Sequence, residues 1–389
     1  MIKPPYVYAD NAATTQLFPE VLEAMLPFLK DNFGNPSSPY SFSHSAKKAL
    51  QSARERIAEC IGAMPEEIFF TSGGSESDNW AIKNFVFSEF HRQRKILISP
   101  IEHHAIINSC VEAAKRFGFT IISTPVDEHG KIIFQKYREN VSEHIDGISI
   151  MLANNEIGTI EDITALSEIA KEYKIPFHTD AVQAIGHIPI NVRKLGVDML
   201  SASAHKFNGP KGIGFLFVRK GMPLVNFIDG GQQEFGLRAG TENVAAIVGM
   251  AVALSINCQN MTDSIVRLGR MTQIFRSIIL SNIPKGIFNG DEKFHLPGHI
   301  SLSLPNISGE SLMHLLDLRG VAVSTGAACN SHSEEISHVL RAIDLPESLA
   351  HGTIRISFGT NNIESDAITV ANEIVSLYNK MTSIKLHTF

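Results

Sequence analysis

Lys206 lies in a polar turn between two apolar runs, within the stretch DMLSASAHKFNGPKGIGFLFV (198–218). A lysine amine is a poor nucleophile while it is protonated, but an amine held at the end of a strand, out of bulk water, can form a Schiff base. Most lysines in glycine-rich turns are solvated surface residues, so Lys206 alone indicates no particular chemistry. Its significance depends on the polar residues that follow other apolar runs in the chain.

Three of these polar residues suit the binding of a flat heterocyclic ring. Asp180 ends the run IPFHTD and either caps the next helix or pairs with a protonated ring nitrogen, as in pyridoxal phosphate sites. His103, in SPIEHHA, is either a surface residue or an imidazole that stacks on the ring and moves a proton. With His104 it lacks the HExxH spacing of a zinc site. Asn155, in ANNEIG, would hydrogen-bond a ring substituent or only its own loop.

Three other features suit anions or sulfur. The stretch TSGGSESDN (71–79) has glycines and hydroxyls that either seat an anion or simply begin a helix, and it lacks the GK[ST] of a Walker loop. Arg355, in the apolar run TIRISFG, either binds a substrate carboxylate or forms an internal salt bridge, because a buried charge needs a partner. Cys329, in STGAACNSHSEE, is either a thiolate nucleophile in a small-residue loop or an idle thiol.

The composition is that of an ordinary globular protein. The 389 residues are 44% hydrophobic and 19% charged, a length that suits two domains. The formal net charge of -6 gives no electrostatic case for a nucleic-acid partner. No apolar run approaches membrane-spanning length and no signal-peptide pattern opens the sequence, so we expect a cytoplasmic protein that does not bind membranes. The four cysteines are widely scattered and form no CxxC pair, so the sequence indicates neither a zinc site nor a disulfide framework.

The elements that must position these residues alternate between strand and helix. Apolar runs predict strands at 68–72, 96–100, 119–126, 148–154, 175–180, 197–203 and 214–220, with helical patterns between several of them. This order is typical of a mainly parallel sheet with helices on both faces, in which ligands bind beyond the carboxyl ends of the strands. The last two runs flank Lys206 and could pair as a hairpin.

A helical pattern from Thr241 to about Leu280 leads into a shorter mixture of strands and helices, which we interpret as a small α+β domain. We therefore predict a large domain over residues 17–258. Residues 1–16 and 259–389 would form the small domain, which carries Cys329.

Short motifs at these positions, taken together, resemble the cysteine desulfurases, fold-type I pyridoxal-phosphate enzymes of the class V aminotransferase group. The resemblance runs almost from end to end, with the motifs in the expected order. They are YADNAATT, GNPSSP, FTSGGSESDN, EHHA, NNEIG, HTDAVQ, SASAHKFNGPKGIG, RAGTEN, STGAAC and IRISFG. The resemblance implies a mainly parallel seven-stranded sheet with helices on both faces, plus a small α+β domain.

The resemblance also implies roles for individual residues around a bound pyridoxal 5'-phosphate. Lys206 would be the Schiff-base lysine and would move the substrate's α-proton. Asp180 would hold the pyridinium nitrogen, Gln183 the ring hydroxyl, and His103 would stack on the ring. Asn155 would lie beside the cofactor and would also bind the substrate.

The phosphate and the substrate have further implied partners. The phosphate would be held by Gly74, Ser75, Ser203, His205 and, from the partner subunit of a homodimer, Thr241. Ser75 stands where threonine is common in the family, so one methyl group is lost and the hydroxyl is kept. Asn35 and Arg355 would contact the carboxylate of the amino acid. Cys329 would form the persulfide and would need loop motion to reach both the substrate and a sulfur acceptor.

The activity implied is conversion of L-cysteine to L-alanine, with the sulfur passed from Cys329 to an acceptor such as an iron–sulfur scaffold. Selenocysteine lyase is a close relative and stays open as an alternative. So does a plain aminotransferase or β-lyase with an idle Cys329, which predicts pyruvate or an oxo acid. A catalytically silent binding module would take up no pyridoxal phosphate. A NAD dehydrogenase is disfavoured, because GIGF (212–215) lacks the third glycine and the strand-to-helix context.

Overall fold

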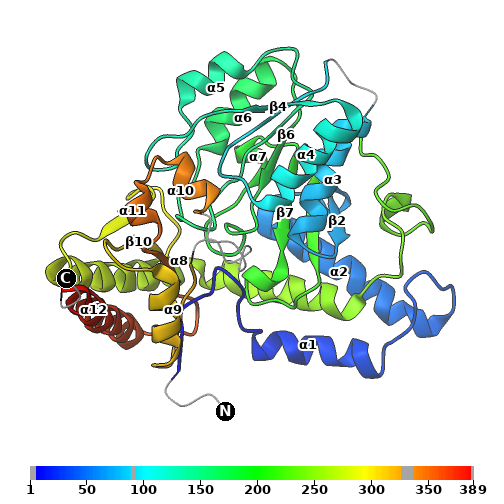
Figure 1. Cartoon of the computed structure of the whole chain (residues 1–389). Helices are drawn as coiled ribbons and strands as arrows, with labels where there is room; N and C mark the ends of the chain where they lie inside the picture. Colours follow the sequence, from blue (N-terminus) through cyan, green and yellow to red (C-terminus); the bar gives the residue numbers. More distant parts are fainter. Residues whose placement is uncertain (1–5, 89–92, 326–335, 387–389) are drawn as a thin grey trace.

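The computed structural model describes residues 6–88, 93–325 and 336–386, and its largest feature is a seven-stranded sheet (Figure 1). The strands are β2 (Ile68–Thr71), β3 (Lys95–Ile98), β4 (Thr120–Ser123), β5 (Gly147–Ser149), β6 (Phe177–Asp180), β7 (Met199–Ser203) and β8 (Gly214–Val218). They follow the order β2-β8-β7-β6-β5-β3-β4, and β8 runs opposite to the others. The predicted mainly parallel sheet is confirmed, and β7 and β8 pair as the predicted hairpin.

Helices cover both faces of this sheet, because successive strand residues point to opposite sides. In β2, Ile68 and Phe70 pack into one core cluster, whereas Phe69 packs into another. The first cluster includes side chains of α1 (Pro19–Lys30), α2 (His44–Ile61), α6 (Ile163–Glu172) and α8 (Val244–Asn282). The second includes side chains of α3 (Gly74–Phe87) and α4 (His104–Phe117). Strands such as β2 and β8, with the sequences IFFT and GFLFV, are therefore apolar and buried at almost every position.

A smaller α+β part of the chain surrounds a separate core cluster. Its antiparallel sheet has the order β12-β10-β9, and a parallel pair joins β1 to β11. These strands are β1 (Val7–Tyr8), β9 (Ile287–Asn289), β10 (His299–Ser303), β11 (Val321–Ala322) and β12 (Thr353–Ser357). Its longer helices are α9 (Gly309–Asp317) and α12 (Glu364–Leu386). Shorter helices elsewhere are α5 (Phe134–Asn140), α7 (Val192–Leu195), α10 (His338–Ala342) and α11 (Glu347–Ala350).

Helix α8 contributes to two of the core clusters and continues from the larger sheet to the side of α12 (Figure 1). Met250 and Leu254 pack in the larger part, whereas Leu268 and Phe275 pack in the smaller. By length and composition α8 could cross a membrane, but 61% of its most apolar window is buried inside the protein, as in a core helix. The predicted domain boundary after residue 258 falls inside this continuous helix, so the division into two domains stays a prediction.

β5 ends at Ser149 and is shorter than the predicted strand at 148–154. The Leu152 N–H still donates to the Asp180 carbonyl at 2.9 Å, but the chain turns at Asn154. The Asn154 side chain accepts hydrogen bonds from the N–H groups of Glu156 and Ile157, at 2.8 and 2.9 Å. These bonds replace strand partners for the backbone, so the apolar run ends in a turn that faces the site described next.

Candidate active site

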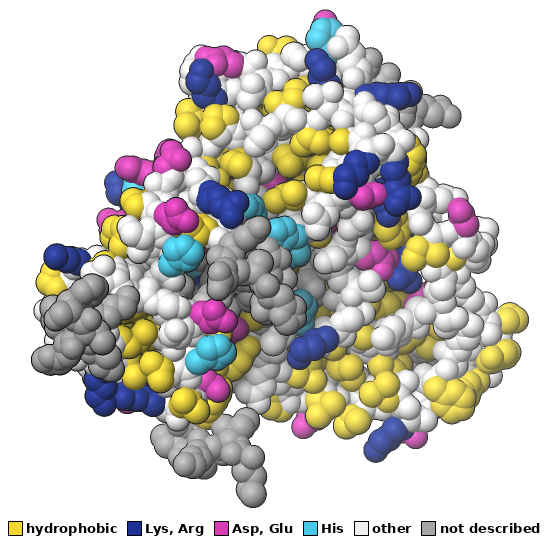
Figure 2. All heavy atoms as spheres, in the orientation of Figure 1, with side chains coloured by type: hydrophobic (Ala, Val, Ile, Leu, Met, Phe, Trp, Pro, Cys, Tyr) yellow, Lys and Arg dark blue, Asp and Glu magenta, His cyan; other side chains and the backbone are white. Residues whose placement is uncertain are grey.

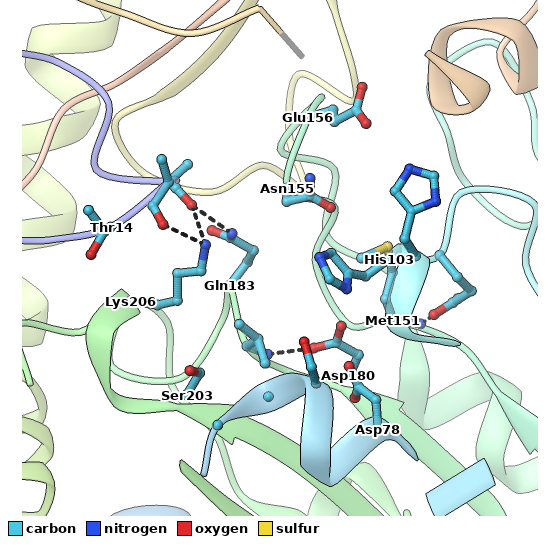
Figure 3. A pocket seen from close by; sticks show the side chains of 18 of the residues that line it. Thr14, Asp78, His103, Met151, Asn155, Glu156, Asp180, Gln183, Ser203 and Lys206 are labelled. Carbon is cyan, nitrogen blue, oxygen red and sulfur yellow. Dashed lines mark hydrogen bonds between the residues drawn. The ribbon is translucent and has the colours of Figure 1, made fainter. Parts of the chain in front are cut away.

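A cavity of about 730 Å³ opens beyond the carboxyl ends of β6 and β7 (Figure 3). Segments that follow five of the strands line it, as expected for a parallel sheet. The predicted site residues that line it are Gly74, Ser75, His103, Asn155, Asp180, Gln183, Ser203, His205, Lys206 and Arg355. Residues far apart in the sequence are thus brought together around one space.

Lys206 is half-buried and follows β7 on a short turn. Its Nζ donates hydrogen bonds to the carbonyls of Ala12 and Ala13, at 2.7 and 2.9 Å (Figure 3). The Lys206 carbonyl in turn accepts a hydrogen bond from His187 Nε2 at 2.8 Å. The alternative of a solvated surface lysine is therefore wrong, because the N-terminal turn holds this amine inside the cavity.

Asp180 ends β6 and is 4% exposed. One carboxylate oxygen accepts a hydrogen bond from Val182 N at 2.9 Å, so this side chain does cap the following turn while it also lines the cavity. Burial raises the pKa of Asp180, and the neighbouring His103 and Lys206, with the hydrogen bond from Val182 N, oppose that rise. Gln183, one turn further on, donates to the Ala12 carbonyl at 3.0 Å.

His103 is held in one tautomer by the start of α4. Its Nδ1 accepts a hydrogen bond from Ala105 N at 3.1 Å, so the ring proton belongs on Nε2. Burial lowers the pKa of His103, while Asp180 raises it and Lys206 lowers it. An uncharged ring in this orientation suits stacking on a flat cofactor and a proton transfer at Nε2.

Two carboxyl groups that the sequence did not suggest lie in the cavity wall beside Asp180. Burial raises the pKa of Glu102 to about 8, and that of Asp78 well above its usual range. Glu102 accepts hydrogen bonds from Ser99 Oγ at 2.6 Å and Met151 N at 2.8 Å. At neutral pH Glu102 is therefore mostly protonated, and it adds little negative charge beside Asp180.

The part of the cavity wall formed by the start of α3 suits a phosphate. Gly73 and Gly74 lead into α3, and a side chain at Gly74 would meet Val182 Cγ2 at 2.6 Å, so only glycine allows this approach. The first N–H groups of α3 have no partner within the helix and favour an anion. Burial, with nearby Lys206 and Lys211, lowers the pKa of His205 to about 4, so it is a neutral donor or acceptor.

These groups fit pyridoxal phosphate. An amine, a buried carboxyl and an imidazole line the cavity together with a helix N-terminus and hydroxyl groups. The missing β-carbon at Gly74 lets Val182 and Ser203 pack closely against the start of α3, which brings the Ser203 hydroxyl and the helix N-terminus to the same wall of the cavity. Within residues 6–88, 93–325 and 336–386, no group of three or more His, Cys, Asp and Glu side chains could hold a metal ion.

Arg355 forms the internal salt bridge that the sequence left as one of two alternatives. Its Nη2 lies 2.8 Å from Asp10 Oδ1, and its Nη1 donates to the Asn155 carbonyl at 3.0 Å. The side chain also lines the cavity, and its buried Nε has no hydrogen-bond partner among the described residues. A contact with a substrate carboxylate stays a prediction that this geometry permits.

Three predicted residues are not brought to the cavity by the described part of one chain. Asn35 accepts a hydrogen bond from Ser37 N at 2.9 Å within its own loop. Thr241 lines a separate cavity of about 90 Å³ that also contacts Ser72. Cys329 lies outside the described residues. The roles of all three stay predictions.

Several residues of the site were missed by the sequence reasoning. The carbonyls of Ala12 and Ala13 contact Lys206, but a carbonyl is common to every residue type, so only the motif DNAATT marked this turn. Ser337 Oγ donates to the buried carboxyl of Glu156 at 2.5 Å beside the cavity. A glutamate directly after the polar pair Asn154–Asn155 was the available signal for this contact.

The chain is similar to known proteins over nearly its whole length. The family described as Aminotransferase class-V matches residues 7–369. A protein named cysteine desulfurase IscS, from Dictyoglomus turgidum, is 47% identical over 97% of this chain and 96% of its own. A solved NifS-like protein has a TM-score of 0.90 at 36% identity, covering 96% of this chain and 99% of that one. SspA in complex with cysteine has a TM-score of 0.79 at 36% identity, over 90% of this chain and 98% of SspA.

Proposed function

The chain belongs to the cysteine desulfurases of the class-V aminotransferase family, and we propose that it moves sulfur from free L-cysteine to its own Cys329. The Cβ–S bond of the substrate breaks and an S–S bond forms on Cys329. The two thiol protons end on the methyl group of L-alanine and on the persulfide. Atoms and electrons balance without a further oxidant or reductant.

The enzyme depends on pyridoxal phosphate, which when bound supplies a conjugated ring that delocalises the electron pair left at a substrate carbon. Lys206 would anchor it and would move the proton at the substrate Cα through Nζ. Asp180 would hold the ring nitrogen protonated, and His103 would lie against the ring with its proton on Nε2. Ser203 and His205, with the start of α3, would hold the phosphate.

One observation carries this proposal: Lys206, Asp180 and His103 line one cavity, with the Lys206 amine held inside it. The alternative of a silent binding module is disfavoured, since such a protein has no need to keep an amine, a carboxyl and an imidazole around one space. No feature of the described residues favours selenocysteine over cysteine.

We also propose a homodimer with Thr241 completing the partner's site. The support is an apolar stripe on α1, where Leu22, Leu26 and Leu29 are 47%, 37% and 58% exposed, and 71% exposed Phe33 follows. Figure 2 shows hydrophobic side chains gathered over the region of α1. Exposed patches of this kind mark protein interfaces.

The persulfide sulfur would pass to a second protein, such as a scaffold on which iron–sulfur clusters are assembled. The support for this destination is the name IscS carried by the relatives. We place the reaction in the cytoplasm, because a reducing compartment keeps free thiols such as Cys60, Cys110 and Cys258 reduced.

The test is to incubate the purified, pyridoxal-phosphate-loaded protein with L-cysteine and a thiol reductant, then measure alanine, sulfide and pyruvate. We expect alanine and sulfide in equal amounts, and a persulfide on Cys329 when the reductant is left out. Cys329→Ala should abolish both the persulfide and sulfide release. Cys60 is another cysteine and is partly exposed, and Cys60→Ser should change neither.

Other products would contradict the proposal. Pyruvate in place of alanine would indicate a β-lyase. Turnover of selenocysteine without turnover of cysteine would indicate a selenocysteine lyase. A colourless protein that takes up no pyridoxal phosphate would indicate a binding module.

A further inference from the structure

We propose that His299, on β10, positions Asn155 and Arg355 for recognition of the substrate carboxylate. The role rests on the proposed function and extends it to a residue outside the cavity lining. His299 would touch neither substrate nor cofactor, so it is a positioning residue.

The first observation is a shared acceptor. The Asn155 carbonyl receives two hydrogen bonds, one from His299 Nε2 at 3.1 Å and one from Arg355 Nη1 at 3.0 Å. A carbonyl oxygen has two lone pairs, so these two donors satisfy it completely. Because a carbonyl can only accept, Nε2 of His299 must carry the ring proton. The backbone of Asn155 is therefore clamped by one residue from β10 and one from β12.

The second observation is the strand register that places both donors side by side. In the antiparallel pair, His299 lies opposite Ser357 and Ser301 lies opposite Arg355. Directly opposed residues and alternate residues share one face of a sheet, so His299 and Arg355 are diagonal neighbours on the same face. A shift of either donor is thereby transmitted to the other through the shared carbonyl and the shared sheet.

The third observation is close packing of the turn against the His299 ring. Gly158 has φ +75°, and a β-carbon there would lie 2.8 Å from His299 Nδ1 and 2.5 Å from the His295 ring. Among the described residues, Nδ1 of His299 has no hydrogen-bond partner, so the bond to Asn155 is the ring's polar attachment to the turn. The turn is free of side-chain bulk where it meets this ring.

The fourth observation is the charge balance around Arg355. His299 is 3% exposed, and burial, together with His295 and Arg355, lowers its pKa well below the usual value. A neutral imidazole donates to the carbonyl without placing a second positive charge beside the guanidinium. Asp10 pairs with the far side of that guanidinium at 2.8 Å. The guanidinium of Arg355 is thus held by Asp10 on one side and by the Asn155 carbonyl on the other. Its Nε has no hydrogen-bond partner among the described residues.

Loss of the His299 donor should weaken substrate binding more than it slows the chemical steps. Without the His299 donor, the Asn155 carbonyl loses one of its two hydrogen bonds in a buried setting. The turn then moves toward the remaining donor, and Arg355 moves with it. Because Lys206 and Asp180 are held by other contacts, the steps at the substrate's α and β carbons should change less than the affinity for the carboxylate.

The experiment compares His299→Phe, which keeps the ring volume without a donor, with His299→Gln, whose amide nitrogen extends about as far as Nε2. His299→Asn is a third variant whose amide is too short to reach. For each holoenzyme, KM and kcat for cysteine are measured, together with the Kd for L-alanine from the absorbance of the bound cofactor. Exposed His351→Gln is the matched control.

We expect KM and the alanine Kd to rise about tenfold in His299→Phe and His299→Asn, the size expected for one lost buried hydrogen bond. His299→Gln should stay within about twofold of wild type, and kcat should change less than KM in every variant. If His299→Phe does not fold, the Gln and Asn pair decides the question by itself.

Three results would overturn the proposal: unchanged KM and Kd in His299→Asn, equal damage from Gln and Asn, or a fall in kcat with KM unchanged. A wild-type protein that makes no alanine from cysteine would instead contradict the proposed function. The two failures are therefore distinguishable.

Discussion

The side-chain amine of Lys206 donates a hydrogen bond to the carbonyl of Ala12 at 2.7 Å, across 194 positions of sequence. The same carbonyl accepts a hydrogen bond from Gln183 at 3.0 Å. The N-terminal turn is thus a wall of the active site and a bridge between the segments that follow β6 and β7. Both the amine's position and the wall's stability can be tested.

Replacing Lys206 with alanine should remove the covalent tether for pyridoxal phosphate. Treatment with borohydride followed by mass measurement should show a cofactor adduct on wild type and none on Lys206→Ala. Activity should fall on the order of 10³-fold, because the residue that moves the α-proton is lost. Lys211→Ala removes a nearby exposed lysine and should keep the adduct. An adduct that persists in Lys206→Ala would place the tether elsewhere.

Thr15 secures the N-terminal turn to the segment that carries Lys206. It is 5% exposed, and its hydroxyl donates to the His205 carbonyl at 2.8 Å and accepts from Asn208 N at 2.7 Å. Thr15→Val should lower the free energy of unfolding by about 1–3 kcal/mol, since both buried partners lose a bond. Thr15→Ser keeps the hydroxyl and should lie much closer to wild type. Denaturant titration of the two variants checks this; equal stabilities would show that the hydroxyl contributes nothing.

Glu156 should make stability depend on pH. Burial raises its pKa to about 7, opposed by the Ser337 hydroxyl and the charge of Arg355. Below about pH 4.5 the carboxyl is protonated in both the folded and unfolded states. Between about 4.5 and 7 only the unfolded state releases the proton, so the free energy of unfolding falls as pH rises, by about 3 kcal/mol in all.

Glu156→Gln should remove that contribution while keeping an acceptor for Ser337. The difference in unfolding free energy between wild type and Glu156→Gln should therefore shift in favour of the variant as pH rises through this window, and stay level above it. Substitution of the exposed Glu20 by glutamine serves as the control. A difference that does not vary with pH would mean that Glu156 titrates normally.

Gly158→Ala should destabilise the turn beneath Asn155. The residue has φ +75°, and the added carbon would meet the His295 ring at 2.5 Å. Gly221 has φ +91° with nothing within 4 Å, so Gly221→Ala isolates the backbone cost. We expect about 1 kcal/mol for Gly221→Ala and about 2–4 kcal/mol for Gly158→Ala, because the second adds a steric clash. Similar losses in thermal or denaturant unfolding would refute a tight contact with His295.

Mixing two inactive variants tests whether Thr241 serves the partner's site. In a heterodimer of Lys206→Ala with Thr241→Ala, one site would combine an intact Lys206 with an intact Thr241 from the other subunit. Activity should therefore reappear when the two proteins are unfolded together and refolded. If Thr241 serves its own chain, every site stays defective and no activity returns.

The larger sheet could be predicted from the sequence because most of its strands are buried on both faces. Apolar runs such as IFFT and GFLFV have that appearance, and polar residues mark where several of the runs end. Asp180 and Lys206 could be placed at one edge for the same reason, since parallel strands end together.

Other contacts could not be predicted, because neither the residue types nor their neighbours in the sequence indicate the partner. The partner of Arg355 is Asp10, which lies 345 positions away in the sequence. An internal salt bridge and a substrate contact both require an arginine, so the residue type alone could not distinguish the two. The acceptors for Lys206 are backbone carbonyls, which side-chain identity does not reveal. Asn35 and Thr241 do not line the cavity of a single chain. The predicted role of Thr241 depends on a second copy, and the predicted role of Asn35 stays a prediction.

Because α8 is one continuous helix that packs in both core clusters, neither half of the molecule can be replaced independently of the other. A graft that joined a foreign C-terminal half at residue 258 would have to match the rotation and length of the helix as well as the surfaces it meets. An insertion of one or two residues there would rotate Leu268 and Phe275 about the helix axis. Their side chains would then point away from the core residues against which they now pack. Length variation among natural or engineered versions should therefore be confined to the loops.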